Sequence, residues 1–376
     1  MRLLQRSSSW LSLFAADALP DPAAWPSLLD PLREALESLG PHPELAAAHA
    51  WQGELVEALD RLELPAWLIC QLISAHNDWL YRRAIDLSLA EMQAQGWGAP
   101  PASFCMLMLG SGARGESLLA PDQDNAMIIA DYPDARHTEI DGYFQSLGER
   151  FTARLDDAGI PLCQGHVMAR WPMWRKRLSE WCAQLEIWTA ERRVKRVQQA
   201  NILFDFRPVF GEAVLAEALS EEVARQLPPS HLFLDEMASL LDELPLALDR
   251  LGRLSGDGDG APHDGAIDLK HQGMLPLVNA VRLLALRHGV RPPDTRSRLV
   301  ALVMMEVITA ERAEALTAAL ERLQALMLQG QRRALAEGRS PDGWVDTTRL
   351  RDDQRRLLRR DLLDIRSLIR QARRAA

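Results

Sequence analysis

At 376 residues, with 47% hydrophobic and 25% charged residues, the chain has the composition of a soluble globular protein that is large enough for two or three domains. Its four cysteines are widely spaced and form no CxxC pair, which argues against a zinc ribbon or a disulfide framework, and its net charge of −9 argues against a general affinity for nucleic acid. No apolar run reaches the roughly 20 residues that a membrane span needs, and no convincing secretory signal is present, so we expect a cytoplasmic protein.

In chain order, the first segment is helical in character. Residues 1–95 are rich in Leu, Ala, Glu and Arg, and their apolar positions recur at helical spacing. Prolines interrupt this pattern, which predicts several short helices, and the run at 68–96 predicts one long helix that Gly96 and Gly98 end. We therefore expect an N-terminal helical region over residues 1–95.

The sequence changes in character after residue 96. Short apolar runs alternate there with segments of helical spacing, and this order predicts a small mixed sheet with helices around it. The predicted strands are 104–109, 125–131, 162–169 and 200–211, and the predicted helices between them are 136–158 and 173–188. The remainder is almost entirely helical, apart from a Gly/Asp-rich loop at 254–270. The expected fold class is α+β, mostly helical overall, with a sheet domain over 96–212 and a C-terminal helical domain over 213–376.

A glycine-rich turn and two aspartates lie between the first two predicted strands, in the stretch LGSGARGESLLAPDQDNAMIIAD. Alternate residues of an extended segment point the same way, so Asp122 and Asp124 should present both carboxylates to one side. Two oxygen ligands side by side suit Mg²⁺, or alternatively Mn²⁺, sharing its coordination sphere with phosphates. Gly110 and Ser111 leave backbone amides and a hydroxyl free to bind phosphate oxygens. Together these features predict phosphoryl or nucleotidyl transfer.

Further charged residues are candidates for the same site. Arg114 supplies a planar cation for the triphosphate. A two-metal site normally needs a third carboxylate, and Asp205, between apolar neighbours in the predicted strand 200–211, is the candidate. Arg207 lies two residues further on, where it either forms a structural ion pair with Asp205 or reaches the nucleotide.

The pattern G-S-x-x-R-x-E followed by D-Q-D-N resembles the nucleotidyltransferase superfamily typified by DNA polymerase beta. More closely, it resembles the bacterial family catalogued as domain of unknown function 294, which is related to the protein-PII uridylyltransferases. The resemblance covers roughly residues 75–376 and is most specific at 109–125 and 201–211. It implies a phosphate-binding pair, Gly110 and Ser111, two metal ligands, Asp122 and Asp124, and a third carboxylate, Asp205. Glu116 matches the motif, but no role for it follows.

The expected function is that of a metal-dependent nucleotidyltransferase, with a nucleotidyltransferase domain over 96–212 and a substrate-binding domain over 213–376. It would transfer NMP from ATP or UTP to an acceptor hydroxyl, deprotonated with help from Asp205, and release pyrophosphate. The resemblance implies a protein side chain as acceptor, in signal transduction. The short apolar runs and the net charge of −9, in turn, lead us to expect neither a membrane nor nucleic acid as partner. Lys270 is expected to bind the nucleotide, and Arg282 either binds a phosphate or the acceptor or is a surface cation.

Two alternatives of other classes stay open on the sequence. One is a catalytically silent nucleotide-binding protein, regulatory or scaffolding, in which the helical flanks carry the biological role. The other is an enzyme that modifies a small molecule such as an aminoglycoside. Release of pyrophosphate separates the first alternative from the expected function, and the fate of a labelled nucleotide separates the second.

Overall fold

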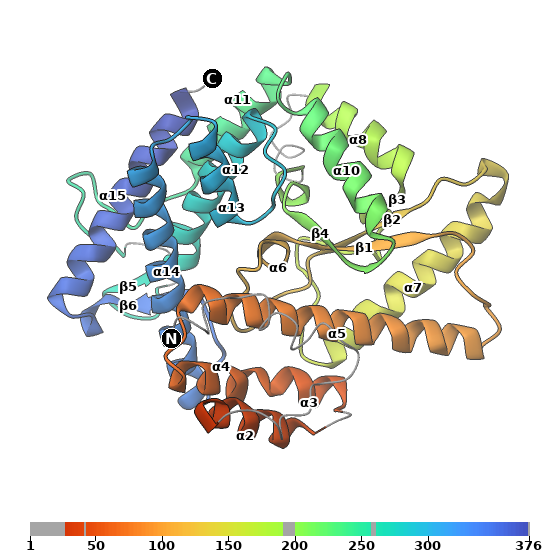
Figure 1. Cartoon of the computed structure of the whole chain (residues 1–376), viewed down its shortest axis with the longest axis horizontal. Helices are drawn as coiled ribbons and strands as arrows, with labels where there is room; N and C mark the ends of the chain where they lie inside the picture. Colours follow the sequence, from red (N-terminus) through yellow and green to blue (C-terminus); the bar gives the residue numbers. More distant parts are fainter. Residues whose placement is uncertain (1–26, 41–42, 191–199, 257–260, 375–376) are drawn as a thin grey trace. The chain divides into compact units, whose positions relative to one another are not determined.

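The computed structural model describes residues 27–40, 43–190, 200–256 and 261–374. It confirms the α+β class, since helices predominate and flank a four-stranded mixed sheet and a two-stranded sheet (Figure 1). The contacts divide the chain into two compact units, of which unit 1 is Met1–Trp181 with Phe206–Leu219 and unit 2 is Cys182–Asp205 with Ser220–Ala376. None of the described helices combines the length and the apolar character that a membrane crossing requires.

Unit 1 contains the four-stranded sheet and the N-terminal helices. Its helices are α2 (Asp30–Leu39), α3 (Leu45–Ala50), α4 (Gln52–Arg61), α5 (Ala66–Ala94), α6 (Gly110–Arg114) and α7 (His137–Asp157), with the 3-10 turns η3 (Ser27–Leu29), η4 (Asp134–Arg136) and η5 (Pro172–Trp174). Its strands are β1 (Phe104–Leu109), β2 (Asn125–Ile129), β3 (Arg175–Arg177) and β4 (Phe206–Gly211). The helices α8 (Leu178–Ala190) and α10 (Ala213–Gln226) begin in unit 1 and end in unit 2. The short helices followed by one long helix agree with the proline pattern and with the run at 68–96.

The sheet has the strand order β3-β2-β1-β4. Strand β1 runs antiparallel to both β2 and β4, and β3 runs parallel to β2. Every residue of β1 and β2 is buried, which is the reason that both read as continuous apolar runs. Strand β4 lies at the edge of the sheet, where Pro208 is tolerated although it cannot donate a hydrogen bond. The long helix α5 contacts β4, and α7 packs against α5 (Figure 1).

Three sequence predictions in this region need correction. The strand expected at 162–169 is wrong, because Leu162 makes one isolated bridge to Gln123 and the backbone then turns, with His166 N donating to Cys163 O at 3.0 Å. The helix expected at 173–188 begins only at Leu178, since the preceding residues form β3. Of the strand expected at 200–211, the first four residues are helical and the strand begins at Phe206.

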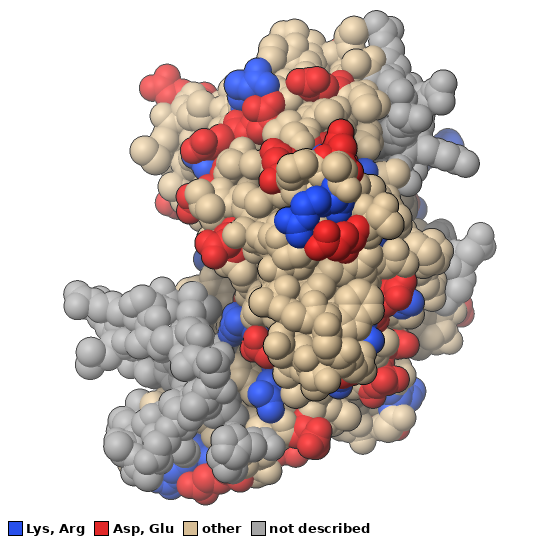
Figure 2. Space-filling view, turned by 90° about the vertical axis from the view of Figure 1, so that its right-hand side faces the viewer, with Lys and Arg blue, Asp and Glu red and all other residues tan. Residues whose placement is uncertain are grey.

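Unit 2 is a helical bundle with a small two-stranded sheet. Its helices are α11 (His231–Leu240), α12 (Leu275–Arg287), α13 (Thr295–Met304), α14 (Ala310–Ala336) and α15 (Asp352–Arg374), with the short elements η6 (Leu241–Glu243), η7 (Lys270–Met274) and η8 (Thr347–Arg349). Its strands β5 (Ala266–Asp268) and β6 (Trp344–Asp346) pair antiparallel, and β5 lies within the predicted loop 254–270. Helix α12 is buried over most of its length because α11, α13 and α15 all pack on it. On the face drawn in Figure 2, basic side chains are interspersed with acidic ones.

Candidate functional site

The glycine-rich turn follows β1 directly and opens the short helix α6. Gly110 has a φ of +57°, a conformation that L side chains rarely adopt. A Cβ on Gly110 would also lie 3.1 Å from Asp124 Oδ2. This position therefore needs glycine for two reasons, the backbone conformation and the close approach of a carboxylate, and Ser111 beside it is exposed.

The two aspartates precede β2 and point away from the residue between them. Gln123 is fully buried, and its Nε2 donates to Thr152 O at 2.9 Å and to Ile160 O at 2.8 Å. By contrast, Asp122 is exposed and Asp124 is partly exposed. The buried amide thus fixes the alternation of side chains, and both carboxylates lie on the opposite side from Gln123.

The antiparallel register of β1 and β2 brings the turn and the aspartates together. Leu109 N donates to Asp124 O at 3.0 Å, so the residue before the turn pairs with the second aspartate. One pocket of unit 1 is lined by polar residues from three segments: Asn77 and Tyr81 of α5, Ser111 of the turn, and Ser117, Asp122 and Asp124 of the segment that leads to β2. The structure therefore places four residues singled out from the sequence, Gly110, Ser111, Asp122 and Asp124, around one small space.

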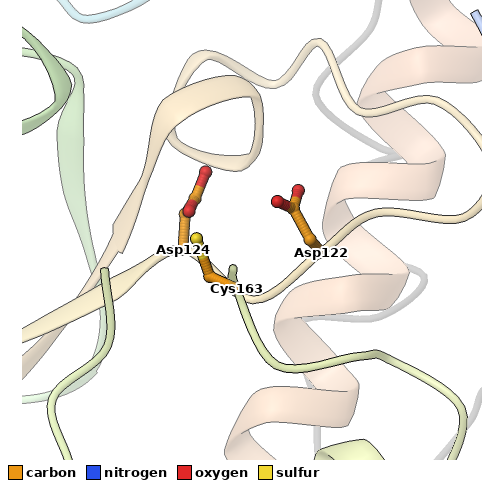
Figure 3. A group of neighbouring side chains, drawn as sticks. All are labelled: Asp122, Asp124 and Cys163. Carbon is orange, nitrogen blue, oxygen red and sulfur yellow. The ribbon is translucent and has the colours of Figure 1, made fainter. Parts of the chain in front are cut away.

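Cys163 is a member of this group that the sequence reasoning missed. Its Sγ and the nearest carboxylate oxygens of Asp122 and Asp124 all lie within 4.8 Å of one another (Figure 3). Burial and the neighbouring charge of Asp124 raise the pKa of the Cys163 thiol to about 11. The local sequence carried no signal for this placement, because residues 162–169 read as a buried strand in which a cysteine is an ordinary apolar residue.

The donor set fits a divalent cation. Two carboxylates contribute oxygens, the ligands that Mg²⁺ and Mn²⁺ take in proteins, and the thiol adds a softer atom. Among the described residues, the group of potential metal ligands is Asp122, Asp124 and Cys163, and Asp205 is not part of it.

Asp205, the expected third carboxylate, lies just before β4 and is fully buried in unit 2. Its Oδ1 accepts from Arg282 Nε at 2.9 Å and from Arg298 Nη1 at 2.6 Å, and its Oδ2 accepts from Arg282 Nη2. The structural pairing with Arg207 considered on the sequence is therefore wrong, because two other arginines bind this carboxylate. The prediction that Arg282 is a surface cation is also wrong, because its side chain is only 6% exposed and binds Asp205.

Arg207 connects the turn to α5. Its Nε and Nη2 donate to Gly112 O at 3.2 and 2.9 Å, and its Nη1 contacts Asp78 Oδ2 at 2.6 Å. Burial raises the pKa of Asp78, while the charge of Arg207 acts in the opposite direction. Arg207 therefore binds the backbone carbonyl of Gly112, while Ser111 of the same turn remains exposed and lines the pocket.

Arg114 and Glu116 form a buried ion pair at the end of α6. Arg114 Nε donates to Glu116 Oε2 at 2.7 Å, and both side chains are less than one-tenth exposed. Glu116, for which the sequence gave no role, is therefore the ion-pair partner of Arg114. Lys270, the remaining predicted nucleotide ligand, is exposed at the start of η7 in unit 2.

Tyr81 contributes a buried hydroxyl to the same pocket. The residue is 2% exposed. Burial raises the pKa of Tyr81 strongly, a hydrogen bond with the Asn125 side chain acts in the opposite direction, and the charges of Asp124 and Asp122 raise the pKa further. The hydroxyl therefore stays protonated at neutral pH and can donate to a ligand.

Comparison with known families agrees with this geometry. The family model described as "Putative nucleotidyltransferase DUF294" matches residues 52–195, which include the turn, both aspartates and Cys163. The model described as "Putative nucleotidyltransferase substrate binding domain" matches residues 231–376, which include α11 to α15. No curated protein matches the chain.

Proposed function

The chain belongs to the DUF294 nucleotidyltransferase family, and on that premise we propose that it transfers a nucleoside monophosphate from ATP or UTP to an acceptor hydroxyl. The observation that carries this proposal is the register of β1 and β2, which sets Asp122 and Asp124 beside the turn of Gly110 and Ser111. Carboxylates for a cation and donors for phosphate oxygens thereby line one pocket. Transfer of a nucleotidyl group depends mainly on such positioning and on charge stabilisation.

The groups of the chain have distinct roles in this proposal. Asp122 and Asp124 would hold Mg²⁺ or Mn²⁺, which would neutralise charge on the triphosphate. The exposed Ser111 and the amides of the turn bind phosphate oxygens. Tyr81, which lines the pocket, donates its hydroxyl hydrogen to a polar ligand atom there. The acceptor oxygen then bonds to the α-phosphorus, the bond from that phosphorus to the bridging oxygen breaks, and pyrophosphate leaves.

The arginines support the turn in this proposal. Arg207 keeps the turn in place through Gly112 O and acts as a positioning residue. Arg114, predicted from the sequence as a nucleotide ligand, is instead engaged in its buried ion pair with Glu116, and Lys270 of unit 2 remains a predicted nucleotide ligand. The acceptor loses its proton to solvent. Asp205, the base predicted from the sequence, has no part in this proposal because it is fully buried and arginines bind both of its oxygens. We leave Asp205 out of the proposed metal ligands because arginines bind both of its oxygens.

The acceptor in this proposal is a protein side chain in signal transduction, and unit 2 contributes to its binding. The family description of residues 231–376 as a substrate-binding domain supports that division of roles. Residues 52–195, in turn, contain the pocket with both aspartates.

Labelled nucleotides test the proposal directly. The purified full-length chain is incubated with each of the four NTPs, labelled at the α-phosphate, together with Mg²⁺ and a lysate fractionated by size. The expected result is release of pyrophosphate and label on one polypeptide band, with Asp124→Asn abolishing both. Asp134→Asn is the matched control, since its side chain is 88% exposed on η4.

Each other outcome of this experiment contradicts part of the proposal. Nucleotide binding without release of pyrophosphate would indicate a silent binding or scaffold protein. Label that stays with small solutes would indicate a small-molecule acceptor of the aminoglycoside type and would overturn the protein acceptor.

A further inference from the structure

Unit 2 contains a cavity between the turn that joins α13 to α14 and the C-terminal part of α15. Helix α14 packs against both α13 and α15 (Figure 1). The cavity has a volume of about 930 Å³, within the range of roughly 300–1,000 Å³ that is typical of small-molecule sites. All of its lining residues belong to unit 2, and none of them lines the pocket of Asp122 and Asp124. It is therefore a separate candidate site.

Three arginines from two helices line this cavity. Arg312 lies in the first turn of α14, and Arg370 and Arg374 lie near the end of α15. Residues three and four positions apart share one face of a helix, so Ser367, Gln371 and the two arginines of α15 face the cavity together. Arg312 Nη2 donates to Ser367 Oγ at 3.1 Å, which connects α14 to α15 at the cavity wall. The wall is therefore formed before any ligand binds.

The positive charge of this cavity has no internal counter-ion. Within the described part of the chain, Arg312, Arg370 and Arg374 form no ion pair with a carboxylate. The buried Nε of Arg312 also has no hydrogen-bond acceptor among the described residues. Glu306 is the acidic residue of the lining, and it pairs with none of the three arginines. The lining thus has a net formal charge of +2, although the whole chain has a net charge of −9.

We propose that this cavity binds a small anion that bears a phosphate group. Guanidinium groups present planar sets of N–H donors that match the spacing of phosphate oxygens. An anion between the three arginines would also relieve their mutual repulsion. Val303 and Val307 give the same cavity an apolar wall, which suits the remainder of a phosphorylated small molecule. Binding here does not rest on the function proposed above, because it needs neither the divalent cation nor an acceptor.

Isothermal titration of the full-length protein tests this site without an activity assay. The probes are pyrophosphate and AMP, each titrated in a buffer that contains EDTA, so that no divalent cation supports phosphate binding at Asp122 and Asp124. The wild type should bind at least one probe, with an affinity that falls as the salt concentration rises. Tighter binding of pyrophosphate would identify a free phosphate compound as the ligand, and tighter binding of AMP would identify a nucleotide.

Arginine variants assign the binding to the cavity. Arg370 is exposed and its side chain has no partner among the described residues, so Arg370→Gln removes no internal contact. This substitution should weaken binding of the probe at least about tenfold, and Arg312→Gln should act in the same direction. Arg356→Gln is the matched control, because Arg356 is an exposed arginine of the same helix that lies outside the cavity. It should bind the probe like the wild type.

Three results would overturn the anion site: a wild type that binds neither probe at low salt, an Arg312→Gln, Arg370→Gln double variant that binds as tightly as the wild type, or an equal loss of affinity in Arg356→Gln. Failure of this site and failure of the proposed function are distinguishable. Pyrophosphate release from an NTP with Mg²⁺, without probe binding in EDTA, would refute the anion site alone. Probe binding that depends on Arg370, without transfer from any NTP, would refute nucleotidyl transfer and leave the anion site standing.

Discussion

Asp205→Asn separates a structural role of this carboxylate from the role of metal ligand that the motif predicts. Asp205 is fully buried, and Arg282 and Arg298 donate to its oxygens at 2.9 and 2.6 Å. Asparagine has almost the same size but carries no charge, so two buried guanidiniums would lose their shared counter-ion. All three residues belong to unit 2, and the expected effect is therefore a loss of that unit's stability.

The magnitude follows from the burial of this cluster. The side chains of Arg282 and Arg298 are 6% and 2% exposed, so water cannot replace the lost carboxylate. Removing one partner of a buried ion pair costs about 3–5 kcal/mol. Each kcal/mol lowers the melting temperature of a unit of this size by about 2–4 °C, which gives an expected drop of roughly 6–20 °C.

Calorimetric melting of the full-length protein measures this effect. Asp242→Asn is the control, because Asp242 pairs with Arg373 at 2.8 Å while both side chains are about half exposed. A pair of that kind contributes about 1 kcal/mol or less, so the control should melt close to the wild type. An Asp205→Asn protein that melts like the wild type but has lost its Mn²⁺ affinity would refute this reasoning and support the metal-ligand role.

Three further predictions concern the elements that position the pocket. Gly110→Ala should lower the free energy of unfolding by about 1–2 kcal/mol because Gly110 has a positive φ. It should also weaken Mn²⁺ binding, because the new Cβ would lie close to the Asp124 carboxylate. The control Gly142→Ala, which has open space around it in α7, should leave Mn²⁺ binding unchanged, and equal Mn²⁺ affinities in the two variants would contradict the close approach. Arg207→Gln should raise the KM for the nucleotide and lower kcat by releasing the turn, and unchanged kinetics in a correctly folded variant would show that the turn needs no such support. Glu91→Gln should destabilise the protein at pH 7, because hydrogen bonds and charges of Arg154 and Arg150 lower the pKa of Glu91. The stabilisation by the Glu91 carboxylate is present above its ordinary pKa of 4.5 and is lost as the pH falls through the lowered pKa. The unfolding free energies of variant and wild type, measured with denaturant, should therefore converge in acid, and a difference that stays constant with pH would contradict this reasoning.

The parts of the site that the sequence predicted are local in the chain. Two short apolar runs and the glycines between them indicate β1, the turn and β2, because burial on both faces leaves an uninterrupted apolar pattern. The D-x-D spacing likewise gives the side to which Asp122 and Asp124 point, since alternation is a property of the extended backbone itself. No long-range information is needed for either inference.

The parts that the sequence did not predict depend on contacts between distant segments. Cys163 reaches the aspartates because Gln123 and the backbone around it fix a loop that has no regular pattern of its own. The partners of Asp205 lie 77 and 93 positions later, on α12 and α13, and no local pattern announces that pairing. Strand β3 has three residues, all of them basic, and is too short for any periodicity to distinguish it from a helix start.

Binding of Mn²⁺, followed by the loss of the free-ion signal in electron paramagnetic resonance, tests the central claim most directly. The claim is that Asp122 and Asp124 together hold a divalent cation beside the glycine-rich turn. The account predicts binding by the wild type and by Asp134→Asn, and its loss in Asp122→Asn and in Asp124→Asn with melting temperatures unchanged. Full Mn²⁺ binding in a folded Asp122→Asn, Asp124→Asn double variant would contradict it.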